Sequence, residues 1–168
     1  MSVKIAICDD AEKDVALLSS ALLAYDPQFE IVCFSSGQAL LDELSDGGFV
    51  PDLLFLDIYM PGFNGIQTAQ KIRALHEDLK IIFLSSSRDH YPQAYEVFAF
   101  NYLVKPFSQE RLFAVLRETA EQLFAGAIHV SPLRDLGFDD VETQVWQVYY
   151  TTNMLLVLNH AAIGRVVT

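Results

Sequence analysis

Short apolar runs recur along the first two thirds of the chain, each about as long as a β-strand. Three of them are apolar at every position, Ile5 to Cys8, Leu53 to Leu56 and Ile81 to Leu84. Continuous apolar runs of this length are typical of strands that are buried on both faces of a parallel sheet. We therefore predict strands at residues 4–8, 30–34, 53–56, 80–84 and 102–104.

Apolar residues recur at helical spacing in the segments between these runs. In the first segment, Val15, Leu18 and Leu22 fall on one face of a helix. The last segment opens with Ser108, a residue type that caps helix N-termini. We predict helices at residues 11–24, 38–44, 66–75, 92–98 and 108–124.

Strands and helices alternate up to about residue 125. Because strand–helix–strand connections are right-handed, this order predicts an α/β fold with a doubly wound, five-stranded parallel sheet and helices on both faces. We assign residues 1–125 to this domain. Residues 126–168 are predicted to form a C-terminal extension, either a small β module or a shortened output domain, in which 143–152 and 154–158 have the composition of a β-hairpin.

The sequence holds 22 acidic and 11 basic residues, which gives a formal net charge of −11. This negative charge repels the phosphate backbone of nucleic acid unless basic residues are clustered, and the sequence contains no such cluster. No apolar run approaches the roughly 18 residues of a membrane span, and the N-terminus lacks a signal-peptide pattern. Cys8 and Cys33 lie in apolar runs, which predicts that both are buried thiols, reduced as in the cytosol. We therefore expect a cytoplasmic protein without direct contact to nucleic acid or membrane.

Polar residues follow the predicted strands at the edge where the strands end. Asp9 and Asp10 follow the first strand, Asp57 the third, Ser85 the fourth and Lys105 the fifth. Open parallel sheets bind ligands beyond the carboxyl ends of their strands. The five side chains are therefore expected to form one site.

Three carboxylates at one edge repel one another unless a cation lies among them. Oxygen ligands without neighbouring His or Cys indicate magnesium rather than zinc. With magnesium and Lys105 counted, the charges of the three carboxylates are balanced, so a phosphoryl group would enter a neutral site. A metal-bound Asp57 carboxylate can then act as a nucleophile toward phosphorus, while Lys105 and the Ser85 hydroxyl hold the phosphoryl oxygens.

From about Val3 to Phe124 the sequence resembles the receiver domain of two-component response regulators. The resemblance rests on the set of motifs Ile7-Cys8-Asp9-Asp10, Leu54-Phe55-Leu56-Asp57, Met60-Pro61-Gly62, Phe83-Leu84-Ser85 and Asn101-Tyr102-Leu103-Val104-Lys105-Pro106-Phe107. It implies a flavodoxin-like (βα)5 receiver fold that accepts a phosphoryl group on Asp57 from a sensor histidine kinase. Beyond its own phosphorylation and dephosphorylation, such a protein is not an enzyme.

The resemblance also implies a role for each site residue. Magnesium would be bound by Asp10, Asp57 and the backbone carbonyl of Tyr59, with Asp9 acting mainly through water. Ser85 and Lys105 would contact the phosphoryl group, Lys105–Pro106 would be a cis peptide, and Tyr102 would be the switch that turns inward on phosphorylation. The aromatic ring of Tyr59, two residues past the acceptor, is expected to screen the phosphoaspartate from water.

The pattern around Tyr91, Tyr95 and Tyr102 is most similar to receivers whose output is a LytTR-type DNA-binding domain. Residues 126–168 are less than half the length of that output domain and match none of its motifs, so a role in a homodimer or in partner binding is open.

Three other functions compete with a phosphorylated receiver. A haloacid-dehalogenase-type phosphatase needs a second acid two residues past its nucleophile, where Tyr59 stands. A flavodoxin-like electron carrier needs an anion-binding loop after the first strand, where Asp9 and Asp10 stand. A degenerate receiver that acts only as a binding module is disfavoured by the complete set of five residues.

Overall fold

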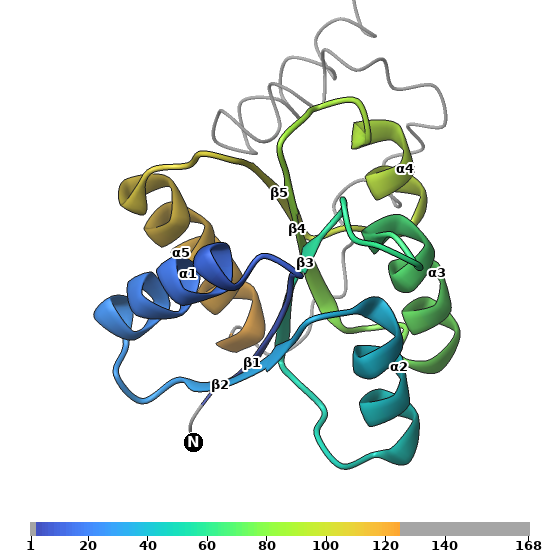
Figure 1. The fold of residues 1–168 in the computed structure, drawn as a ribbon. Coiled ribbons are helices and arrows are strands. Elements are labelled where there is room, and N and C mark those ends of the chain that lie inside the picture. The colour runs from blue at the N-terminus through green and yellow to red at the C-terminus, as the bar shows by residue number, and fades with distance from the viewer. Residues whose placement is uncertain (1–2, 125–168) are drawn as a thin grey trace, which may run out of the picture. The chain divides into compact units, whose positions relative to one another are not determined.

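The computed structural model describes residues 3–124 of the chain, in which strands and helices alternate (Figure 1). The strands are β1 (Lys4–Cys8), β2 (Glu30–Phe34), β3 (Leu53–Asp57), β4 (Lys80–Ser85) and β5 (Asn101–Val104). The helices are α1 (Glu12–Tyr25), α2 (Gly37–Asp46), α3 (Gly65–Leu75), α4 (Tyr91–Glu96) and α5 (Gln109–Phe124). The predicted domain boundary and C-terminal hairpin lie outside the described residues.

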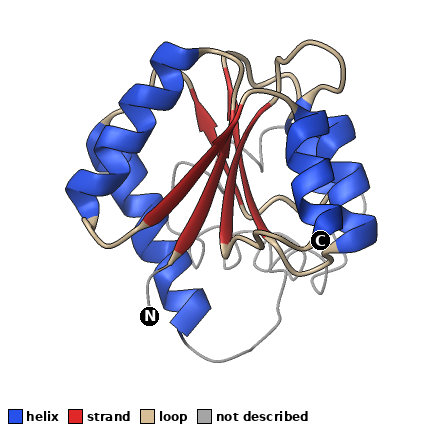
Figure 2. Cartoon of the chain, turned by 60° about the horizontal axis from the view of Figure 1, so that its bottom comes forward, coloured by secondary structure: helices blue, strands red, loops and turns tan. Residues whose placement is uncertain are grey.

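All five strands are parallel and form one sheet in the order β2-β1-β3-β4-β5. Helices α1 and α5 cover one face, and α2, α3 and α4 cover the other (Figures 1 and 2). The strand order reverses between β1 and β3, so the carboxyl ends of these two strands border the crevice where ligands bind in such sheets. The prediction of a doubly wound, five-stranded sheet is confirmed.

The continuous apolar runs are explained by burial on both sides. Every residue of β3 is buried, and so are the four apolar residues that end β1. Cys8 is therefore buried as predicted, whereas the prediction is wrong for Cys33, which is exposed on β2. One side packs on Leu18 and Leu22 of α1 and on Leu112, Val115 and Leu116 of α5. Burying these side chains removes apolar surface from water, which is the main force that holds helices to the sheet.

Element boundaries differ from the predicted ones by a residue or two at most ends. Strands β3 and β4 include Asp57 and Ser85, because each pairs with a residue of the next strand, Leu84 and Val104 respectively. Helix α4 ends earlier than predicted, since Phe98 has a positive φ of 53° that no helix continues. No helix in residues 3–124 is long and apolar enough to span a membrane.

Candidate functional site

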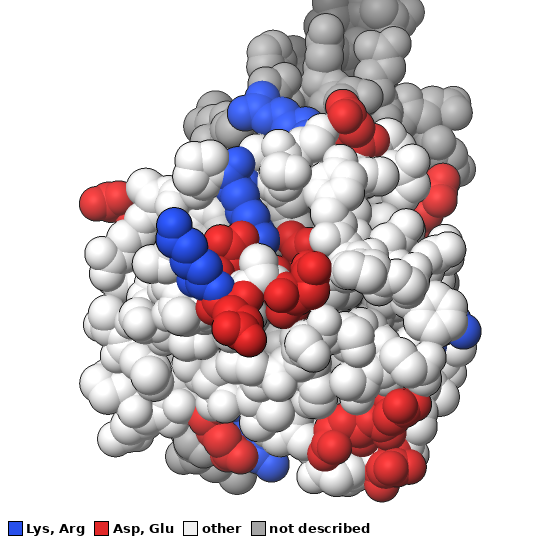
Figure 3. All heavy atoms as spheres, in the orientation of Figure 1, with Lys and Arg blue, Asp and Glu red and all other residues white. Residues whose placement is uncertain are grey.

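Three carboxylates meet where β1 and β3 end. Asp9 and Asp10 follow β1, Asp57 is the last residue of β3, and one ligand oxygen of each lies within 4.8 Å of the others. Asp9 and Asp57 are buried at 3% and 5% exposure, whereas Asp10 is exposed. The Ala11 amide donates a hydrogen bond of 2.9 Å to Asp9 Oδ1, which fixes that carboxylate. Acidic side chains gather at the centre of the face in Figure 3, with basic side chains beside them.

Lys105 enters this group from the end of β5. Its amide donates to the Ser85 carbonyl at 2.7 Å, and the Lys105–Pro106 peptide is cis, as predicted. Its Nζ lies 2.7 Å from Asp9 Oδ2 and 2.9 Å from Asp57 Oδ1. The structure therefore brings together four of the five predicted side chains, Asp9, Asp10, Asp57 and Lys105.

Burial and mutual contact shift the pKa values of these groups. Burial raises the pKa of Asp57, as does the charge of Asp9, while the hydrogen bonds from Lys105 and the Tyr59 backbone oppose the rise. Burial alone would lower the pKa of Lys105, but its bonds to carboxylates outweigh burial and raise the pKa above its usual value. Lys105 is therefore a permanent cation at neutral pH.

Ser85 and Tyr102, the predicted hydroxyl and switch residues, are connected through Ser87. Ser85 is fully buried, and its Oγ accepts a hydrogen bond of 3.1 Å from the Ser87 amide. Tyr102 is 2% exposed, and its hydroxyl donates to the Ser87 carbonyl at 2.6 Å. The Tyr102 ring also meets the edge of Tyr91, with ring centroids 4.4 Å apart. In this structure the Tyr102 ring already occupies an inward position.

Tyr59 has a backbone role and a separate side-chain contact. Its backbone forms a hydrogen bond with Asp57. Its side chain is 48% exposed and meets the ring of His90 edge-on, with centroids 5.2 Å apart. The ring thus lies on the surface two residues past the acceptor.

The loop after Asp57 is held by the start of α3. Asn64 and Gln67 form a capping box, with bonds of 2.9 and 3.1 Å between side chain and backbone. The Gly65 amide donates to the Ile58 carbonyl at 2.9 Å. A Cβ at Gly65 would collide with the backbone of Asp57, so this glycine lets the helix start close to the acceptor.

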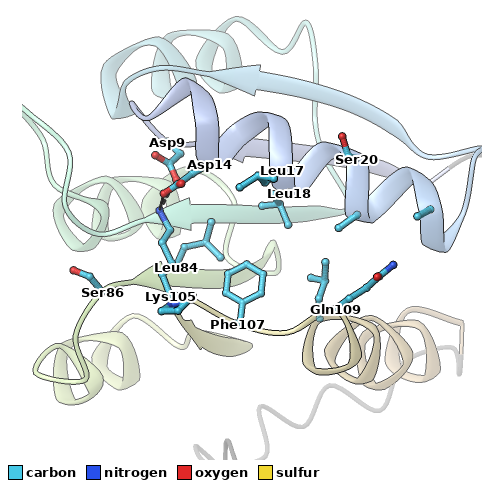
Figure 4. Close-up of a pocket in the computed structure, with 14 residues that line it drawn as sticks. Asp9, Asp14, Leu17, Leu18, Ser20, Leu84, Ser86, Lys105, Phe107 and Gln109 are labelled. Carbon is cyan, nitrogen blue, oxygen red and sulfur yellow. Dashed lines mark hydrogen bonds and ion pairs between the residues drawn. The ribbon is translucent and has the colours of Figure 1, made fainter.

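Asp14 is a site residue that the sequence reasoning missed. Its Oδ2 lies 2.9 Å from Lys105 Nζ, so the lysine is shared with a further carboxylate from the first turn of α1 (Figure 4). The sequence gives one signal for Asp14, namely its position five residues after Asp9 at the start of a helix that begins beside the site. An open cavity of about 740 Å³ begins here and continues between α1 and α5, past Leu17 and Phe107.

Comparison with known proteins places this geometry in a family. Residues 5–117 match the response regulator receiver domain family. The sensory transduction protein LytT of Oceanobacillus iheyensis is 45% identical over 85 residues, which cover 48% of this chain and 34% of the relative. The chain spans about a third to a half of the curated relatives it matches.

Two solved structures have similar folds. The response regulatory domain of MrkE from Klebsiella pneumoniae superposes with a TM-score of 0.66 and 29% identity, covering 71% of this chain and 97% of that domain. Response regulator TrrA from Thermotoga maritima, solved in complex with Mg²⁺ and BeF, gives a TM-score of 0.61 and 29% identity over 70% of this chain and 98% of TrrA. The chain therefore belongs to the response regulator receiver domains of two-component signalling.

Proposed function

We propose that this receiver accepts a phosphoryl group on Asp57 from the phosphohistidine of a sensor kinase. The proposal rests above all on one observation, the Lys105 ammonium held between Asp9 and Asp57 at the edge where Asp10 completes the acidic group. In the transfer, an Asp57 carboxylate oxygen forms a bond to phosphorus while the bond from phosphorus to the donor nitrogen breaks. The electron pair leaves with the imidazole. Lys105 then stabilises the phosphoryl oxygens as charge develops on them.

Magnesium fits the donor set of this site. Asp9, Asp10 and Asp57 offer carboxylate oxygens, and Asp10 is exposed and open to a hydrated ion. The expectation that no cysteine neighbours the site is wrong, since Cys8 directly precedes Asp9. Its thiol points to Met60, however, with 3.7 Å between the sulfurs, and burial raises its pKa to about 12. It therefore offers no thiolate to a softer metal. We propose Asp10, Asp57 and the Tyr59 carbonyl as direct ligands and Asp9 as a ligand through water; bound magnesium would neutralise the phosphoryl oxygens.

Phosphorylation would be transmitted through Ser85 and Tyr102. We expect the Ser85 hydroxyl to turn from the Ser87 amide toward a phosphoryl oxygen. This would move the backbone of Ser87, whose carbonyl accepts the hydrogen bond from the Tyr102 hydroxyl. This coupling would remodel the surface of α4 and β5. A degenerate receiver would not need a lysine cation beside Asp57. The observed contact between Lys105 and Asp57 therefore favours a receiver that is phosphorylated over a degenerate one.

Residues 1–125 are proposed as the phosphorylated unit and 126–168 as an extension that supports a homodimer or partner binding. Truncation before Gly126 tests this division by light scattering. If the truncated and full-length chains dimerise equally, the extension has no part in the dimer.

The phosphoacceptor is tested with phosphoramidate or acetyl phosphate. The full chain is incubated with donor and Mg²⁺ beside an Asp57→Asn variant, and intact mass is measured with and without EDTA. We expect one phosphoryl adduct on the wild type, dependent on Mg²⁺ and labile to hydroxylamine, as an acyl phosphate is. An adduct on Asp57→Asn, or none on the wild type, would refute the proposal.

A further inference from the structure

The ammonium of Lys105 contacts three carboxylates, as many as it has N–H donors. A lysine carries three N–H donors, and Nζ contacts Asp9 at 2.7 Å, Asp14 at 2.9 Å and Asp57 at 2.9 Å. Asp14 is the partner that stands outside the three-carboxylate group. A phosphoryl oxygen on Asp57 can gain a bond from Lys105 only if one of these contacts is given up.

We propose that Asp14 is a positioning residue that restrains phosphorylation of Asp57. It acts through Lys105, by occupying one ammonium donor and by adding a fourth negative charge to the site. The proposal rests on Asp57 being the phosphoacceptor. It assigns Asp14 a role opposite to that of the acidic residues that bind the metal.

Differences in burial among the three partners single out Asp14. The side chain of Asp9 is 2% exposed and that of Asp57 7%, whereas that of Asp14 is 40% exposed. Asp14 is the partner that water can replace. If the Asp14 carboxylate is removed, Lys105 still contacts Asp9 and Asp57. The lysine then keeps its position, and one of its N–H donors becomes free.

Asp14 is fixed in position by helix α1. Its amide donates to the Ala11 carbonyl at 2.9 Å in the first turn, and Figure 4 shows its side chain directed at Lys105 beside Asp9. The contact joins residues 91 positions apart in the sequence. The restraint is therefore part of the packed fold rather than a chance encounter of two flexible chains.

The charge of Asp14 also acts directly on the incoming group. With four carboxylates, Lys105 and bound Mg²⁺, the site has a net charge of −1, and removal of Asp14 makes it neutral. Asp14 Oδ2 and Asp57 Oδ1 each lie 2.9 Å from the same nitrogen, so they are within about 6 Å of each other. For a partly exposed charge at this distance, we expect a rate effect of about tenfold, equivalent to ~1.4 kcal/mol.

The test compares Asp14→Asn, Asp14→Glu and Glu12→Gln with the wild type. Glu12 is an exposed acid in the same first turn of α1, so Glu12→Gln removes the same charge without the contact to Lys105. Acetyl phosphate is the donor, at Mg²⁺ concentrations that saturate every variant. The phosphoryl group passes to an Asp57 oxygen, and the bond to the donor oxygen breaks with release of acetate. Initial rates are read from intact mass.

We expect Asp14→Asn to be phosphorylated about tenfold faster than the wild type, and Asp14→Glu and Glu12→Gln to stay within about threefold of it. Calorimetric titration with Mg²⁺ alone gives a second readout, in which Asp14→Asn is expected to bind several-fold more weakly because an anion near the cation is lost. A merely structural lesion would weaken both metal binding and phosphorylation. A faster phosphorylation together with weaker Mg²⁺ binding in Asp14→Asn is therefore specific to the proposed role.

Three results would overturn the inference. They are an unchanged or slower rate in Asp14→Asn, an equal acceleration in Glu12→Gln, and unchanged Mg²⁺ affinity in Asp14→Asn. Failure of the wild type and every variant to form an adduct would instead refute the proposed phosphoacceptor, and the restraint with it. A wild type that is phosphorylated while Asp14→Asn does not differ from it would refute the restraint alone.

Discussion

Replacing the acceptor Asp57 by asparagine is expected to stabilise the metal-free protein. Its side chain is 7% exposed, and burial raises its pKa, with Asp9 adding to the rise and Lys105 opposing it. A carboxyl whose pKa is higher in the folded than in the unfolded state destabilises the fold at pH values above the unfolded pKa. The neutral amide removes this penalty and keeps the shape of the side chain.

Coulomb's law gives the size of the effect. At an effective dielectric constant of about 20, the attraction between Asp57 and Lys105 across 2.9 Å is about 6 kcal/mol. Repulsion from Asp9 or Asp10 across at most 4.8 Å is at least about 3.5 kcal/mol each. The two repulsions together exceed the attraction, and the loss of hydration of a buried carboxylate adds to them. We expect Asp57→Asn to raise the free energy of unfolding by about 2 kcal/mol at neutral pH.

Urea unfolding followed by circular dichroism measures this difference, in EDTA and in saturating Mg²⁺. Metal bound by the wild type alone adds about 2.7 kcal/mol at a hundredfold excess over Kd, so Mg²⁺ should cancel or reverse the difference. The difference should also shrink as pH falls toward 3.8, the ordinary pKa of Asp57, because the wild-type side chain becomes neutral there.

A charge-matched control is available on α2. Asp42 is exposed and accepts a hydrogen bond from Gln38, so Asp42→Asn should change stability by no more than about 0.5 kcal/mol. Should Asp57→Asn prove no more stable than the wild type in EDTA, the electrostatic reasoning would be refuted.

Three further predictions address the loop, the aromatic ring and the thiols. Gly65→Ala should lower the free energy of unfolding by about 2 to 3 kcal/mol in urea titrations, because the added methyl meets the backbone of Asp57; an unchanged midpoint would contradict that contact. Tyr59→Asn should speed the loss of phosphoryl adduct several-fold, followed by intact mass after donor removal, because its half-exposed ring no longer screens the neighbouring acceptor; equal rates would exclude screening. Ellman's reagent at mildly alkaline pH should modify exposed Cys33 quickly and Cys8 only after unfolding, because burial raises the pKa of Cys8 to about 12; fast modification of both would show that Cys8 is accessible.

The local sequence pattern was sufficient to predict most helices and strands, because one physical effect dominates at each of them. The run Leu53 to Leu56 is apolar at every position because β3 is buried on both faces, so the run alone was enough to predict this strand. Ser108 caps α5 as predicted, with its Oγ accepting from the Arg111 amide at 3.1 Å, since capping needs only residues within one turn. Helix α4 was placed less well, because its end depends on the positive φ of Phe98, which a phenylalanine gives no reason to expect.

The sheet, the helices and the meeting of Asp9, Asp10, Asp57 and Lys105 could be predicted from the sequence, because parallel strands bring their carboxyl ends to one edge. Which groups share the lysine depends instead on how the elements pack. Asp14 looks like an ordinary acid at a helix N-terminus, where such residues are common, and only the packing of α1 beside the end of β5 brings it to Lys105. The inward position of Tyr102 was also decided by packing, since its hydroxyl reaches a carbonyl 15 residues away. Pairings of this kind depend on distances between elements, which no local pattern encodes.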